Sequence, residues 1–345
     1  MPDTSASPDP SPGTVSTTRS RPVAAFVKRV LRLVIISYVV ILIVLGFFQR
    51  KLLYRPSVAD ALPIASFPQA TGGYSSADDV DMVCRNGETI RGWLLREPGD
   101  TPRPLVLYFH GNARNRSDRG PWYELLRDAG LDVLAIDYQG YGDSGGKTTE
   151  ATIEQSCDAT WTYATTELGY APDQLVVAGT SLGGAAAVYT AHKQSQAGAA
   201  PSCLFVTATF SSMADVAGSL YWWVPVRALL VDTFPSAQRA SGITCPVLVM
   251  HGDVDKLVDQ KFGERLFEAF PETAANGMQR RWQNLAGISH HGIVENGYDT
   301  ILLAIRGLLH DVALAADNSN AAALTDRDRS AASDQTDSSA TSTQP

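Results

Sequence analysis

The sequence predicts an α/β protein with a mostly parallel central sheet covered by helices on both faces, and one apolar helix near the N-terminus. Short apolar runs alternate along the chain with segments of helical pattern, as in parallel sheets that are buried on both sides. An antiparallel hairpin precedes these runs, and one longer apolar run is long enough to cross a membrane. With 345 residues, the chain can form one sizeable domain with appendages.

The expected sheet begins with an antiparallel hairpin. Its strands are residues 80–83 and 89–95, and Asn86-Gly87 between them favours a tight turn. The five apolar runs that follow have the length and composition of buried parallel strands. They are residues 105–109, 133–136, 175–178, 204–206 and 247–250.

Composition and charge exclude several classes of protein. The chain is 44% hydrophobic and 19% charged, which is typical of a chain that buries a core. Its net charge of -8 argues against nucleic acid as a partner, because phosphates require a basic face. The cysteines have no metal-ligand spacing, and we expect neither a metal nor another cofactor. Buried thiols are favoured, although a bridge between Cys203 and Cys245 stays open because each begins a predicted strand.

Changes in composition divide the chain into parts. Residues 1–22 and 315–345 are rich in small and polar residues, and we expect both to be disordered tails. Residues 23–50 form the expected transmembrane anchor, followed by a linker at residues 51–77. Residues 78–314 form the expected folded domain. A small cap is expected within it, at residues 211–243, where a long segment separates two predicted strands.

The apolar run 30–48 carries the prediction of a membrane anchor. At a helical rise of about 1.5 Å per residue, its 19 residues span roughly 28 Å, close to the hydrocarbon thickness of a bilayer. Arg32 lies one turn inside, where its side chain can reach the head groups. A cleaved signal peptide is the alternative, but the run is long for one and lacks small residues after it.

Basic residues flank this run on both sides and are more numerous before it. This excess predicts a cytoplasmic N-terminus and a folded domain on the non-cytoplasmic side. The residues before or within the run are Arg19, Arg21, Lys28, Arg29 and Arg32, and those after it are Arg50, Lys51 and Arg55.

The strongest chemical motif surrounds Ser181. Gly179-Thr180-Ser181-Leu182-Gly183 follows a predicted strand and precedes an alanine-rich helix, which is the context of the G-x-S-x-G nucleophile elbow. Glycines are needed there because bulkier side chains would collide with the adjoining strand and helix. The turn points the hydroxyl outward at a helix N-terminus, whose partial positive charge favours an oxyanion. Ser181 is therefore the predicted nucleophile.

A serine nucleophile needs a general base, which is itself oriented by a third group. In chains with this elbow, the acid follows a later strand and the histidine lies near the C-terminus. Asp255 follows the last of the five apolar runs and is the predicted acid, with Asp253 and Asp259 as rivals. His290 follows a further short predicted strand and is the predicted base, with His291 as the alternative.

The oxyanion that develops during acyl transfer requires two hydrogen-bond donors. The first predicted donor is the backbone N–H of Leu182, directly after the nucleophile. The second is the backbone N–H of Asn112, in the loop after the run 105–109. Each such donor typically lowers the barrier by roughly 3 kcal/mol. His110, in the same loop, is expected to hold the loop rather than to take part in catalysis.

Several motifs occur in an order that resembles the α/β-hydrolase superfamily. They are Phe109-His110-Gly111-Asn112-Ala113, Asp137-Tyr138-Gln139-Gly140-Tyr141-Gly142-Asp143-Ser144-Gly145, the Ser181 elbow, and His251-Gly252 followed by Asp255. More narrowly, Leu-Leu-Tyr-Arg-Pro-Ser at residues 52–57 resembles a subgroup with one N-terminal membrane segment. That subgroup includes acyl-thioesterase-like, lipase-like and serine-aminopeptidase-like members. The resemblance spans residues 50–312 and implies a serine hydrolase; His291-Gly292 departs from the usual pattern.

The aromatic residues of the expected cap have two possible roles. Tyr221, Trp222 and Trp223 could form an apolar channel for an acyl chain and reach the bilayer near the anchor, or they could only cover the core. We therefore expect a small-molecule or lipid acyl substrate, together with the membrane, as partners. The sequence does not predict an oligomeric state.

The primary expectation is hydrolysis of a carboxylic ester or thioester through an acyl-Ser181 intermediate. A serine-aminopeptidase-like amidase would use the same apparatus. A catalytically silent binding protein on the same fold is a third hypothesis, and the complete set of catalytic residue types argues against it.

Overall fold

The computed structural model describes residues 21–99 and 102–339, with side chains for residues 23–99 and 102–318. The chain divides into two units, Met1–Phe48 and Gln49–Pro345. The first unit carries most of one long helix. The second carries the sheet and every catalytic residue that the sequence predicts.

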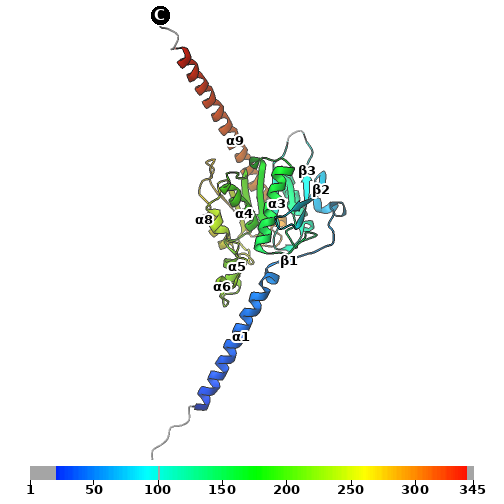
Figure 1. The fold of residues 1–345 in the computed structure, drawn as a ribbon, viewed down its shortest axis with the longest axis vertical. Coiled ribbons are helices and arrows are strands. Elements are labelled where there is room, and N and C mark those ends of the chain that lie inside the picture. Colours follow the sequence, from blue (N-terminus) through cyan, green and yellow to red (C-terminus); the bar gives the residue numbers. More distant parts are fainter. Residues whose placement is uncertain (1–20, 100–101, 340–345) are drawn as a thin grey trace, which may run out of the picture. The chain divides into compact units, whose positions relative to one another are not determined.

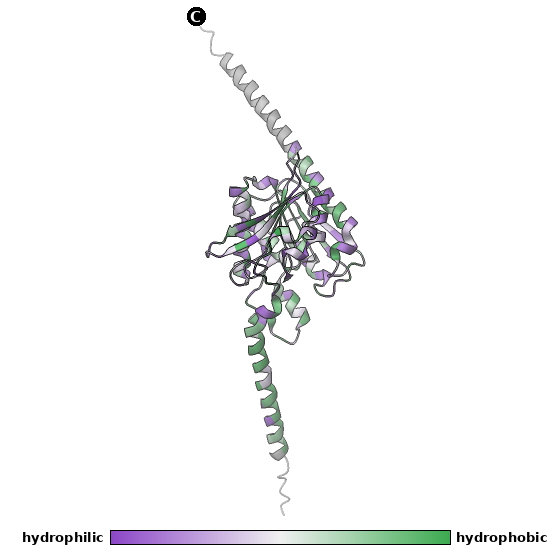
Figure 2. Ribbon diagram, turned by 90° about the vertical axis from the view of Figure 1, so that its right-hand side faces the viewer, coloured by the Kyte–Doolittle hydropathy of each residue, from purple (hydrophilic) through white to green (hydrophobic). Residues whose placement is uncertain are grey.

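The long helix α1, Arg21–Leu53, begins in the first unit and ends in the second. Its apolar side chains between residues 23 and 48 are mostly exposed, and Figure 2 shows it coloured as hydrophobic along most of its length. Over Val23–Leu53 it is long and apolar enough to cross a membrane, as a permanent anchor or a signal sequence would be. No other helix in the described part of the chain meets this criterion.

An eight-stranded sheet forms the centre of the second unit (Figure 1), in the order β10-β9-β8-β7-β4-β6-β3-β2. Neighbours from β10 to β6 are parallel, whereas β3 pairs antiparallel with both β6 and β2. The strands are β2 Ser76–Val83, β3 Thr89–Arg96, β4 Leu105–Phe109, β6 Asp132–Ile136, β7 Leu175–Thr180, β8 Cys203–Thr207, β9 Val247–Gly252 and β10 Arg281–Leu285. Separately, β1 Arg55–Pro56 pairs parallel with β5 Ala113–Arg114.

Helices cover both faces of this sheet. Successive residues of β4 pack into two apolar clusters on opposite faces, Leu107 into one and Tyr108 into the other. Because every residue of β4 is buried, both faces must be covered. Side chains of α3, α4 and α8 join the first cluster, and those of α2 and α9 join the second. These helices are α2 Gly120–Asp128, α3 Glu150–Thr162, α4 Leu182–Gln196, α8 Gln260–Ala269 and α9 Ile293–Ser339.

Short helices occupy the segment between β8 and β9, inside the residues expected to form a cap. They are α5 Met213–Leu220, α6 Val226–Leu229 and α7 Ser236–Ala240. Other short elements lie in the loops of the described chain: η1 Ile64–Ser66, η2 Pro68–Thr71, η3 Arg116–Asp118 and η5 Pro172–Gln174 are 3₁₀ turns, and η4 Tyr163–Glu167 is a π-helical turn after α3.

The predicted α/β architecture is confirmed, including the hairpin and each of the five apolar runs. Four of the five strands extend beyond their runs, and β7 and β9 reach Thr180 and Gly252 because pairing with neighbours continues past the last large apolar residue. The C-terminal tail differs from expectation, since α9 continues to Ser339. Alanine, which is frequent there, has the highest helix propensity of all residues. Residues 1–20 and 340–345 of the expected tails lie outside the described residues.

All four cysteines of the chain are buried and free: Cys84, Cys157, Cys203 and Cys245. The bridge between Cys203 and Cys245 that the sequence left open is therefore not formed. Burial raises the pKa of the Cys203 thiol to about 12, and it raises the pKa of Cys245 as well. Both thiols are thus protonated and inert near neutral pH.

Candidate active site

Ser181 joins β7 to α4 in a strained turn. Its backbone has φ 56° and ψ -120°, a conformation that residues other than glycine rarely adopt. Two hydrogen bonds hold the turn: Ser181 N donates to Thr207 O at 2.9 Å, and Thr209 Oγ1 donates to Ser181 O at 2.8 Å. The strand–turn–helix geometry expected from the motif is therefore present.

The glycines beside Ser181 have no room for a side chain. A Cβ on Gly179 would lie 2.0 Å from the backbone oxygen of Gly183, and a Cβ on Gly183 would lie 1.9 Å from the backbone oxygen of Phe109. Both separations are far shorter than a van der Waals contact. The ends of β7 and β4 and the start of α4 thus meet closely at Ser181, and only glycine permits this.

The N-terminus of α4 lies directly after Ser181, because the helix begins at Leu182. The first amides of a helix have no partner within it, and they carry partial positive charge. The N–H of Leu182, the first expected oxyanion donor, belongs to this group. The Leu182 side chain is buried, which fixes the position of the residue.

His290 and Asp255 form a close pair. The distance from His290 Nδ1 to Asp255 Oδ2 is 2.7 Å, so Nδ1 carries the proton and Nε2 is the ring nitrogen able to accept one. Asp255 Oδ1 accepts two further bonds, from the backbone amides of Leu257 and Val258, each at 2.9 Å. The carboxylate is thus held from both sides.

A second histidine also contacts this carboxylate. His251 is fully buried, and its Nε2 lies 2.8 Å from Val258 O and 3.5 Å from Asp255 Oδ2. Burial alone would raise the pKa of Asp255, but hydrogen bonds from His251 and His290 outweigh it and hold the pKa well below its ordinary value. Asp255 is therefore ionised at neutral pH.

Three predicted residues follow parallel strands at one edge of the sheet. Ser181 follows β7, Asp255 follows β9 and His290 follows β10. Since β7, β8, β9 and β10 are adjacent and parallel, their carboxyl ends lie at the same edge. Within the described chain no hydrogen bond joins Ser181 Oγ to His290, and such bonds are often long before substrate binds.

The loop after β4 lies beside Ser181. A Cβ on Gly111 would be 3.6 Å from the Cβ of Ser181. The backbone oxygen of Asn112 accepts bonds from Arg55 N at 2.9 Å and from Tyr141 Oη at 2.8 Å. These bonds fix the residue whose N–H is the second expected oxyanion donor.

Buried side chains after β6 support the same loop. Tyr138 Oη donates to His110 O at 2.9 Å, and His110 Nε2 lies 3.1 Å from Asp137 Oδ1. The guanidinium of Arg116 binds Asp137 and Asp143, each at 2.6 Å. The long motif that begins at Asp137 therefore has a structural role, and His110 holds the loop, as expected.

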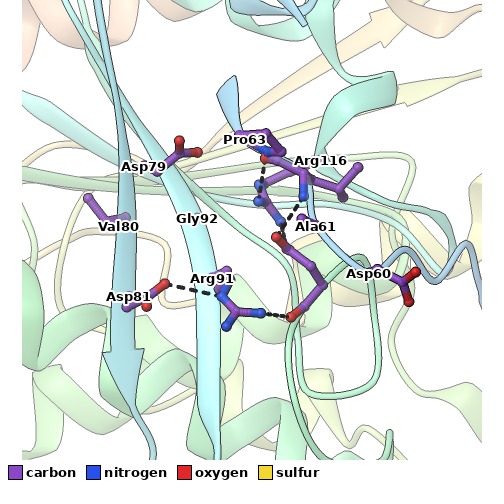
Figure 3. A pocket seen from close by; sticks show the side chains of 11 residues that line it. Asp60, Ala61, Pro63, Asp79, Val80, Asp81, Arg91, Gly92 and Arg116 are labelled. Atoms are coloured by element: carbon purple, nitrogen blue, oxygen red, sulfur yellow. Dashed lines mark hydrogen bonds and ion pairs between the residues drawn. The ribbon is translucent and has the colours of Figure 1, made fainter. Parts of the chain in front are cut away.

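A cavity of about 280 Å³, lined by charged and apolar side chains, lies between linker residues 60–63 and the β2–β3 hairpin. Figure 3 shows Arg91 directed toward Asp81, with which it forms an ion pair of 3.3 Å. Arg116 lines the cavity, but Ser181 and the other predicted catalytic residues do not. The cavity is separate from the candidate active site.

Comparisons with known proteins agree with this fold. The family model described as serine aminopeptidase, S33, matches residues 100–234. The uncharacterized protein Rv2307c of Mycobacterium tuberculosis is 31% identical over 266 residues, which cover 77% of this chain and 89% of that protein. The esterase Pf2001 of Pyrococcus furiosus has the same fold, with a TM-score of 0.55, 18% identity, and coverage of 75% of this chain and 98% of that one. The chain belongs to the α/β-hydrolase superfamily.

Other similar proteins carry hydrolase names. The lysophosphatidylserine lipase ABHD12 of Danio rerio is 29% identical over 180 residues, which cover 48% of this α/β-hydrolase and 47% of that protein. The carboxylesterase EstE1, cloned from a metagenomic library, shares the fold at a TM-score of 0.53 and 19% identity, covering 72% of this chain and 97% of its own. The family match and these relatives support a hydrolase.

The rival residues of this α/β-hydrolase have other partners. Asp253 accepts a backbone N–H from the loop before His290 at 2.7 Å. Asp259 caps the N-terminus of α8. His291 is exposed, whereas His290 pairs with Asp255. The structure thus brings together the acid and base that the sequence favoured.

Sequence reasoning missed two residues that support the α/β-hydrolase site. Thr209 lies two residues after the end of β8 and holds the Ser181 turn, and no motif marks it. His251 contacts the acid from within β9. Its only sequence signal is its place at the start of the His-Gly motif that leads to Asp255.

Proposed function

We propose that this α/β-hydrolase is a membrane-anchored serine hydrolase that cleaves a carboxylic ester or thioester, including lipid-linked ones, through an acyl-Ser181 intermediate. The observation that carries the proposal is the pair of His290 and Asp255, which lies at the sheet edge where Ser181 follows β7. A strained serine, an oriented histidine and an ionised carboxylate are the parts that acyl transfer requires.

The reaction would proceed in two stages. His290 Nε2 takes the proton of Ser181 Oγ as that oxygen attacks the carbonyl carbon, and Asp255 stabilises the imidazolium. The N–H groups of Leu182 and Asn112 stabilise the tetrahedral oxyanion. Its collapse expels the alcohol or thiol, which receives the proton from His290. Water activated by His290 then attacks acyl-Ser181 and releases the carboxylic acid.

The substrate class rests on the relatives. Similarity to a lysophosphatidylserine lipase and to esterase structures supports an acyl ester as substrate. The match to the serine aminopeptidase model favours a second candidate, cleavage of an amide by the same residues. The proposed partners are accordingly an acyl substrate and the bilayer. The net charge of -8 argues against nucleic acid.

The helix α1 supports the proposal of a permanent anchor. Residues Val23–Leu53 exceed the length that a bilayer core requires, and basic residues flank the apolar run. Since more of them precede the run than follow it, we propose that the folded domain lies on the non-cytoplasmic side. Extraction with alkaline carbonate tests the anchor: the full chain should stay in the membrane pellet at its full length, whereas cleavage would indicate a signal peptide.

Labelling with a fluorophosphonate tests the nucleophile. The detergent-solubilised full chain should be labelled, and Ser181→Ala should abolish the labelling without changing the melting temperature. Absence of labelling in the wild type would contradict an active serine and favour a silent binding protein. p-Nitrophenyl esters of rising chain length, beside aminoacyl anilides, then separate esterase from amidase activity.

A further inference from the structure

The cap exposes a group of large apolar side chains around the connection between α5 and α6. We call this group the cap tip; it consists of Leu220, Tyr221, Trp222, Trp223 and Val231. Trp222 is 83% exposed and Val231 is 62% exposed. Monomeric domains rarely turn several such side chains to water at one place, and such patches usually mark an interaction surface.

The charge of the surrounding segment fits a lipid partner. Residues 216–231 contain no acidic residue and one basic residue, Arg227. The Arg227 side chain is largely exposed while it pairs with Asp215 at 2.9 Å. Tryptophan and tyrosine beside arginine are the residue types that concentrate at the boundary between hydrocarbon and water.

Hydrogen bonds tie the cap to the end of α1. Gln49 Nε2 donates to Leu229 O at 3.2 Å, and Val231 N donates to Gln49 Oε1 at 2.8 Å. Arg50 donates to both carboxylate oxygens of Asp232, at 2.8 and 3.1 Å. These residues of α1 lie in its last turns, at the end of the segment able to cross a membrane.

A buried carboxylate makes this connection firm. Asp232 is only 4% exposed, and Tyr54 Oη donates to it at 3.0 Å in addition to Arg50. Because an unpaired buried charge is strongly unfavourable, the cap is not expected to separate from the helix end. Val231, which belongs to the cap tip, is adjacent to this carboxylate in the chain.

We propose that the cap tip inserts into the interfacial region of the bilayer leaflet at which α1 ends. This inference rests on the proposed anchor, since the bilayer must end near Gln49 and Arg50 for the cap tip to reach it. The hydrolase would then contact the membrane at two places, through α1 and through the cap. A substrate dissolved in that leaflet would approach the domain from the membrane side.

A label at Trp222 tests the proposal in the full chain. Because all four native cysteines are buried, Trp222→Cys provides a selective site for a nitrobenzoxadiazole label. In phosphatidylcholine vesicles, the emission of this label should shift to shorter wavelength relative to that of the free label in buffer without detergent. Lipids that carry a spin label near the head group should reduce its emission several-fold. The matched control is Leu303→Cys on α9, also exposed at 68%, whose label should be quenched little.

The outcomes distinguish failure of the proposed membrane contact of the cap tip from failure of the proposed membrane anchor. If carbonate leaves the chain in the membrane but the Trp222 label is quenched no more than the Leu303 label, the cap proposal is overturned and the anchor stands. If carbonate releases the chain, the anchor proposal fails first. A shift to shorter wavelength that is lost as the protein is diluted into more lipid would indicate contact between two copies and overturn the lipid assignment. Val231→Cys provides a second site if Trp222→Cys does not fold.

Discussion

The Nδ1 atom of His290 lies 2.7 Å from Oδ2 of Asp255, while the neighbouring His291 is exposed. Adjacent histidines in one loop have a similar local sequence, so the sequence motif alone is weak evidence for which of them is the general base. The carboxylate makes the distinction, because it orients one ring and fixes its tautomer. This pair gives the proposed mechanism its sharpest test.

We expect His290→Gln to lower kcat for p-nitrophenyl butyrate by about 10³- to 10⁴-fold, because the general base is lost. His291→Gln is the matched control and should keep kcat within about threefold of the wild type, as is usual for an exposed residue. Steady-state kinetics in detergent measure both. A larger loss in His291→Gln than in His290→Gln would reverse the assignment.

We expect Asp255→Asn to lower kcat by about 10³- to 10⁴-fold, because an amide holds the wrong histidine tautomer. Asp253→Asn should have little effect, since the asparagine oxygen can still accept the backbone N–H that Asp253 binds at 2.7 Å. Equal losses in the two variants would show that the loop as a whole, rather than the carboxylate of Asp255, is responsible.

Gly183→Ala should prevent folding of the elbow, because its Cβ would lie 1.9 Å from the backbone oxygen of Phe109. We expect insoluble protein or a melting temperature far below that of the wild type. Gly218→Ala in α5 is the control, since a Cβ there meets nothing within 4 Å. That change should stabilise the protein by up to about 1 kcal/mol, the difference in helix propensity between the residues.

Arg116→Met should destabilise the domain by about 3–5 kcal/mol, because it leaves the buried carboxylates of Asp137 and Asp143 without their cation. Arg96→Met is the control. The ion pair of Arg96 with Asp78 is exposed on both sides, so its loss should cost less than about 1 kcal/mol. Thermal unfolding in detergent measures both variants.

The destabilisation in Arg116→Met should also depend on pH. Burial alone would raise the pKa of Asp143, but the hydrogen bond and charge of Arg116 outweigh it and hold the pKa below its ordinary value. In the wild type, this carboxylate therefore stabilises the fold above about pH 4, and the contribution is lost as the pH falls through the lowered pKa. Without Arg116 only backbone hydrogen bonds oppose the effect of burial, so the ionised carboxylate is less stable, and the difference in melting temperature from wild type should be larger at pH 7 than at pH 4. A constant difference would contradict this account.

The fold could be predicted because the sequence pattern within each element indicates its type. The apolar runs of the parallel strands and the Asn86-Gly87 turn depend on the residues within each element. Strand ends were less certain, since β9 continues to Gly252 through pairing with β10, which no local pattern records. The helical backbone of α9 beyond residue 315 differs from the expected disordered tail, because the polar composition there is combined with many alanines, which favour a helix.

The site could be predicted in part for the same reason. Ser181 and Asp255 lie in motifs whose glycines and spacing are visible in the sequence. The contacts of Thr209 with Ser181 and of His251 with Asp255 join residues brought together by the sheet. Such contacts depend on strand order and register, which become known only when the chain is folded.

The four cysteines determine how the fold depends on its redox environment. Each thiol is buried and unpaired, so no covalent cross-link is needed to complete the fold, and oxidants have little access to the sulfur atoms. The domain can therefore reach its native state in a reducing cytosol or in an oxidising compartment alike. The state of its cysteines therefore does not tie the folded domain to one redox environment.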